Sequence, residues 1–88
     1  MSIKIHGAVI REQGVSFVVL LVNPAAMLTQ SEADKTREAF QRYFPDLSIV
    51  LASQNARGLF EYQGRPELVR FLALIDASRI PWKECTLG

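Results

Sequence analysis

The sequence predicts an α+β domain, a two-layer α/β sandwich in which both helices lie on one face of a mixed sheet. Residues 15–22 and 47–52 are apolar at odd and even positions alike, as in strands covered on both faces. Two further segments carry apolar residues at helical spacing. The elements follow the order ββαββα plus a C-terminal tail, within a single domain spanning residues 1–88.

The first two strands are expected to form an antiparallel hairpin. In residues 3–10, apolar side chains lie on one face and polar ones begin the other, as is typical of an edge strand. Residues 15–22 form the central strand. Between them, residues 11–14 make a turn in which Gly14 can adopt a positive φ. The hairpin therefore brings the edge strand beside the most apolar strand of the chain.

The first helix begins near residues 29–31 and stops at Pro45. Two capping boxes overlap at its start, one from Thr29 and one from Ser31, and only one of them can be right. A strand, a helix and a further strand usually form a right-handed crossover, so residues 15–22 and 47–52 are expected to be parallel.

The second half of the chain supplies a further strand, the second helix and the tail. A turn at 53–58 leads into a half-exposed strand at 59–63. Pro66 opens the second helix, because proline is well tolerated at a first helical position. The tail at 82–87 is either a short last strand or an extended cap, and its pattern does not choose between them.

With both helices on one face, the other face of the sheet needs a cover. Val18 and Leu20 point to that face and would form part of a large apolar patch. A homodimer that pairs this face is the favoured solution, and a tail that folds beneath it with Trp82 is the alternative. Val18, Leu20 and Trp82 are therefore the predicted interface residues.

A polar end is the candidate ligand site. Parallel strands gather ligands at their carboxyl ends, and a helix N-terminus attracts anions. The residues expected there are Asn23, Ser31, Gln54, Asn55 and Arg57. A small anion could bind among them, although turns and helix caps also select these residue types.

Composition excludes several other functions. The net charge of +1 does not indicate a basic surface that would bind nucleic acid. The apolar run at 17–22 is far shorter than the roughly 20 residues that cross a bilayer. His6 is the only histidine and Cys85 the only cysteine, so the sequence predicts no metal site, no cofactor and no catalytic constellation. The lone cysteine and the lack of a signal peptide favour the cytoplasm.

Two resemblances accompany these patterns. Residues 48–75 resemble the closing ββα of thioredoxin-like proteins, but without a Cys-x-x-Cys motif the resemblance implies no redox activity. The turn Asn-x-Arg-Gly at 55–58, Tyr-x-Gly-Arg at 62–65 and Ile-Pro-Trp-Lys at 80–83 are similar to those of a family of small bacterial α/β proteins with no assigned activity. The function expected is a non-catalytic interaction domain, self-associating or partner-binding; the alternative is an anion binder or minor enzyme at the polar end.

Overall fold

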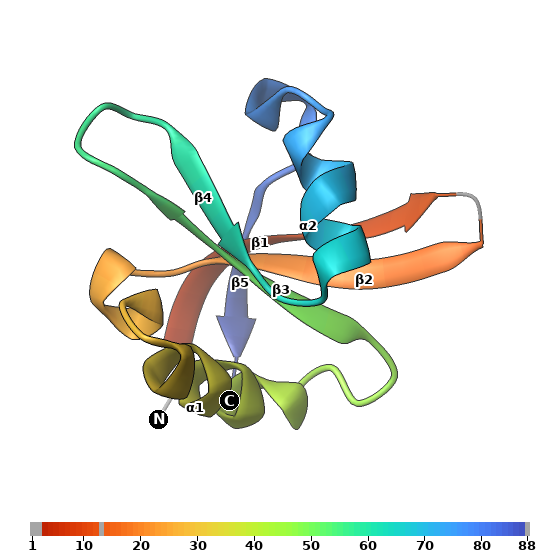
Figure 1. Ribbon diagram of the computed structural model, residues 1–88. Coiled ribbons are helices and arrows are strands. Elements are labelled where there is room, and N and C mark those ends of the chain that lie inside the picture. Colours follow the sequence, from red (N-terminus) through yellow and green to blue (C-terminus); the bar gives the residue numbers. More distant parts are fainter. Residues whose placement is uncertain (1–2, 13, 88) are drawn as a thin grey trace.

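The computed structural model describes residues 3–12 and 14–87, which form a five-stranded sheet with two helices (Figure 1). The elements in chain order are β1 (Ile3–Glu12), β2 (Val15–Leu21), the 3-10 turn η1 (Pro24–Met27), α1 (Gln30–Gln41), β3 (Ser48–Gln54), β4 (Phe60–Gln63), α2 (Pro66–Ala73), the 3-10 turn η2 (Ala77–Arg79) and β5 (Lys83–Leu87). The predicted α+β class and element order are confirmed, and the tail forms a strand.

The sheet is mixed, with the order β4-β3-β2-β1-β5. β2 and β3 are parallel, as the crossover rule predicts, and every other neighbouring pair is antiparallel. β1 and β2 form the expected hairpin, and Gly14 has the positive φ of 80° that the turn needs. The predicted turn residue Gln13 lies outside the described residues.

The two helices lie on opposite faces of the sheet, so the prediction that both cover one face is wrong. Val18 and Leu20 of β2 share a buried cluster with Ala33 of α1, whereas Phe17 and Val19 share another with α2. In Figure 1, α1 lies below the sheet and α2 above it. A central strand that is apolar on both faces is thus covered by a helix on each, which gives three layers in place of two.

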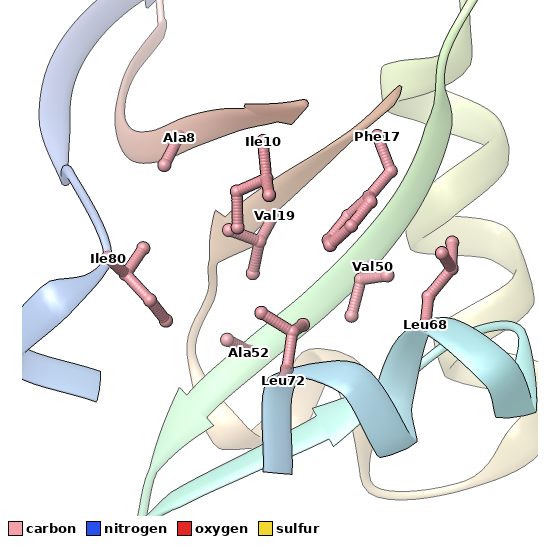
Figure 2. Close-up of a cluster of buried hydrophobic side chains, with 9 residues drawn as sticks. All are labelled: Ala8, Ile10, Phe17, Val19, Val50, Ala52, Leu68, Leu72 and Ile80. Atoms are coloured by element: carbon pink, nitrogen blue, oxygen red, sulfur yellow. The ribbon is translucent and has the colours of Figure 1, made fainter. Parts of the chain in front are cut away.

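The core on the α2 side is built from alternate residues of three strands, closed by one helix. Figure 2 shows these side chains gathered between the strands and α2, with Ile80 pointing in from the segment that leads to β5. Phe17 meets Phe71 of α2 edge-on, with ring centroids 6.0 Å apart and planes at 87°. This geometry is favourable for aromatic pairs because a ring's positive edge faces a negative ring face.

The start of α1 settles which capping register is used. The Thr29 hydroxyl accepts a hydrogen bond from the Glu32 backbone N–H at 3.1 Å, and the helix begins at Gln30. Ser31 therefore lies inside the first turn, and the alternative cap from Ser31 is wrong. Thr36 then ties the helix to η1, because its hydroxyl donates to the Ala26 carbonyl at 3.0 Å.

Candidate functional site

The predicted polar end is made of turn residues whose side chains are occupied locally. The Asn23 side-chain oxygen accepts from the Ala25 N–H at 3.0 Å and thereby caps η1. The Asn55 oxygen accepts from the N–H groups of Arg57 and Leu59 at 2.9 and 3.1 Å. Gln54 donates its amide to the Gly58 carbonyl at 2.9 Å. These groups hold the β3–β4 connection and η1 in shape.

Ser31 and Arg57 are exposed, at the start of α1 and in the β3–β4 turn respectively. All five predicted residues follow β2, end or follow β3, or lie in the first turn of α1, as expected from the parallel pair. Across residues 3–12 and 14–87, one hydrogen bond joins two of them, from the Arg57 backbone N–H to the Asn55 side chain, and no hydrogen bond or ion pair links the side chain of one to the side chain of another. The anion site at this end stays a prediction that no assembled cluster supports.

Replacing Asn55 with alanine should lower the free energy of unfolding by about 1–2 kcal/mol, because two backbone N–H groups lose their acceptor. Urea unfolding of Asn55→Ala measures the loss. Asn55→Asp is the matched control, since its carboxylate keeps an acceptor at the same place and should retain most of the stability. An unchanged midpoint for Asn55→Ala would mean that the amide is not needed by the turn and is free for a ligand.

The charged side chains near α2 are shaped by local hydrogen bonds. The Ser78 backbone N–H donates to Asp76 at 2.9 Å and lowers the pKa of that carboxyl, with a smaller contribution from Arg79. The pKa of Glu67 is lowered by a backbone hydrogen bond at the start of α2 and by Arg65, its ion-pair partner. Burial raises the pKa of the Tyr62 phenol. All three shifts have local structural causes.

The single histidine and the single cysteine lie on neighbouring strands. His6 is exposed on β1 opposite Glu84 of β5, and Cys85 is a partly buried free thiol. In the described part of the chain, no group of three or more His, Cys, Asp or Glu residues could hold a metal ion. No helix among these residues is both long enough and apolar enough to cross a membrane.

The predicted interface residues are mostly internal. Val18 and Leu20 are 2% and 1% exposed in the single chain, because α1 covers their face of β2. Trp82 is partly buried and stacks on Phe60, with ring centroids 5.7 Å apart and planes 15° from parallel. Both side chains are thus buried within the single chain, Trp82 packs beside β4, and self-association through Val18, Leu20 and Trp82 stays a prediction.

A different feature stands out at the outer edge of β1. β5 pairs only with Ile3–Gly7, although β1 runs to Glu12. Among the described residues no strand pairs with residues 8–12 on that side, although Pro81, just before β5, lies near Val9. We call this open stretch, residues 8–12 of β1, the β1 edge. Unpaired backbone N–H and C=O groups at such an edge are ready partners for another strand.

The β1 edge lies between two hollows, one on each face of the sheet. The α2-side hollow has a volume of about 560 Å³, and its lining includes Ile10, Phe71, Ile75, Ile80, Arg11 and Arg79. The α1-side hollow has a volume of about 230 Å³, and its lining includes Gly7, Val18, Leu20, Phe44, Lys83 and Cys85. Val9 and Pro81 line both hollows. Val9 is 45% exposed, so its side chain is accessible at the β1 edge.

The sequence contains only a faint signal for this site. The first strand is much longer than the tail that pairs with it, 10 residues against 5. Pro81 just before the tail would also have indicated a break in the ladder, since proline cannot donate a hydrogen bond. Neither signal is informative until the tail is known to be a strand beside β1.

Comparison of the chain with protein-family models, with curated proteins and with solved structures finds no match.

Proposed function

We propose that this protein is a non-catalytic interaction domain that binds an extended segment of a partner protein as an added strand on the β1 edge. The single observation that carries the proposal is the position of this open edge between two hollows on opposite faces. Strand addition takes its affinity from main-chain hydrogen bonds and its specificity from pockets that receive alternate side chains.

The geometry of a β-strand explains why two hollows matter. Successive side chains of a strand point to opposite faces, and neighbouring strands lie about 4.8 Å apart. A strand laid along the β1 edge would continue the line of β5 and send its side chains alternately toward the α2-side and α1-side hollows. Apolar lining residues such as Ile10 and Phe71 on one side and Val18 and Phe44 on the other would cover them.

The opposite edge of the sheet is less suited to this role. β4 has 4 residues, and short edge strands are a common means of preventing strand addition. Its apolar residues Phe60 and Tyr62 are already packed against the α2-side core and against each other. The β1 edge is therefore the better docking place.

A homodimer formed by two β1 edges is the second form of the same proposal. In this form the dimer interface lies at residues 8–12 of β1 and not at Val18 and Leu20. Light scattering over a dilution series tests it directly, because a stable dimer that Val9→Lys dissociates would identify a second copy as the occupant.

The proposed location of the protein is the cytoplasm. The single cysteine favours a reducing cytoplasm. The thioredoxin-like resemblance of residues 48–75 adds no redox role, since Cys85 has no second cysteine to pair with, and the resemblance to small bacterial proteins adds no activity.

Replacing Val9 with lysine should weaken the binding of an added strand at least tenfold, because an edge lysine blocks strand addition. The ligands are peptides selected from a phage-displayed random library against the wild-type domain, and fluorescence anisotropy gives their Kd. Val15→Lys is the matched control: Val15 is 46% exposed on β2 and lines neither hollow. Equal binding to both variants, or a library that yields no binder, would overturn the proposal.

A further inference from the structure

We infer that the segment bound at the β1 edge is acidic, with a short apolar centre flanked by carboxylates. This inference depends on the proposed function and identifies the chemistry of its ligand.

The two hollows contain positive charge and no negative charge among their described lining residues. Arg11 and Arg79 line the α2-side hollow, and Lys83 lines the α1-side hollow. The whole chain has ten basic and nine acidic residues, so an all-basic lining is a local departure from a balanced surface. Such a concentration of one sign attracts the opposite sign and repels like charge.

The three basic side chains are also available to a ligand. All three are exposed, and among the described residues none of them forms an ion pair, whereas Arg37 and Arg65 have carboxylate partners. Arg79 acts on its neighbour Asp76 at longer range, where it contributes to lowering the pKa of that carboxyl. A carboxylate arriving with a ligand would therefore meet arginines that are free to bind it with two hydrogen bonds.

The apolar lining determines the centre of the ligand. Ile10, Phe71 and Ile80 offer no polar side-chain atom, so a residue directed between them must be apolar to compensate for its desolvation. β-branched residues fit this position because they favour an extended backbone.

The same charges disfavour a second copy of this chain as the occupant. Pairing two β1 edges around a twofold axis would place one basic lining, with Arg11, Arg79 and Lys83, against another. Juxtaposed like charges weaken such an interface. An acidic partner segment gains from the charges that a second copy would have to overcome.

Three labelled peptides test the inference: acetyl-Ser-Asp-Val-Ile-Val-Asp-Ser-amide and the same peptide with asparagine or lysine in place of aspartate. The acidic peptide should bind about tenfold more tightly than the asparagine peptide at low salt, because each of its two carboxylates can form an ion pair with an exposed basic side chain. This preference should shrink at about 0.5 M salt, where screening is strong.

Arg79→Glu should abolish the preference for the acidic peptide and favour the lysine peptide. Arg57→Glu is the matched control, because Arg57 is an exposed arginine in the β3–β4 turn and lines neither hollow. If Arg57→Glu removes the preference and Arg79→Glu does not, the anion binds at the polar end and the inference is wrong. Equal affinity for the acidic and asparagine peptides also overturns it.

Two N-methylated forms of the acidic peptide separate this inference from the proposed function. One carries methyl groups on its odd amides and the other on its even amides, so only one form can keep the amides that face β1. Strand addition predicts that one form loses binding and the other retains it. If both forms bind like the parent while the acidic preference persists, strand addition fails and charge recognition stands. If one form fails while the asparagine peptide matches the acidic one, strand addition stands and the charge inference fails.

Discussion

Replacing Leu20 with alanine is expected to lower the free energy of unfolding by about 2–5 kcal/mol. Leu20 is 1% exposed between β2 and α1, so its loss removes apolar contacts and leaves a cavity within the single chain. The free energy of unfolding of a small domain is only about 5–15 kcal/mol, so the variant should be close to unfolding at moderate temperature. Urea unfolding followed by circular dichroism measures the effect.

Leu28→Ala is the control for this change. Leu28 is 79% exposed just before α1, and its truncation should alter stability by less than about 0.5 kcal/mol. The comparison also decides between two roles for Leu20. If Leu20 were an interface residue on an open sheet face, its truncation would alter the solution mass and leave the stability of the monomer nearly unchanged.

Replacing Phe17 with alanine should be at least as costly, at about 3–5 kcal/mol. Phe17 is 1% exposed at the centre of the α2-side core, where it meets the edge of the Phe71 ring. The change removes an aromatic ring from the layer opposite to Leu20. The urea midpoint should therefore fall by a large fraction of its value.

A double-mutant cycle with Phe71→Ala isolates the aromatic pair. The loss of unfolding free energy in the double variant should differ from the sum of the two single losses by about 0.5–1.5 kcal/mol, which is the coupling energy of the two rings. Strict additivity of the two losses would show that the rings do not interact, and that α2 does not pack on Phe17 as the structure has it.

Much of the fold was predictable because the local patterns had one physical solution. The apolar residues at both parities of β2 required cover on both faces, and the structure provides it. The positive φ of Gly14, the parallel pairing of β2 with β3 and the Thr29 cap also follow from local chemistry. Each of these predictions depended on residues that are close in sequence or on a general rule of chain crossing.

The placement of α2 was not predictable in the same way. Helical spacing reveals an apolar stripe such as Leu68 and Leu72, but it does not say which face of the sheet the stripe covers. Both faces of the central strands were apolar and could have accepted it. The wrong choice made one face look empty, and the predicted interface at Val18 and Leu20 followed from that error.

The candidate site had a further obstacle. The predicted polar residues are near strand ends because turns need them there, as the hydrogen bonds of Asn23 and Asn55 demonstrate. The β1 edge instead exists because β1 extends beyond the end of its pairing with β5, a strand from the opposite end of the chain. That is a property of tertiary register, and no local pattern encodes it.

The register that pairs Ile3 with Leu87 also bears on how the domain folds. It closes a loop across nearly the whole described chain, so this pairing has the largest loop-closure entropy of any in the sheet. β5 is therefore expected to join last during folding and to detach first in local fluctuations. Each detachment would free Ile3–Gly7 as well, and the entire outer edge of β1 would then be open to a wrong partner, including a β5 from another molecule. The strand that limits the binding edge is thus also the strand whose loss would start aggregation or domain swapping.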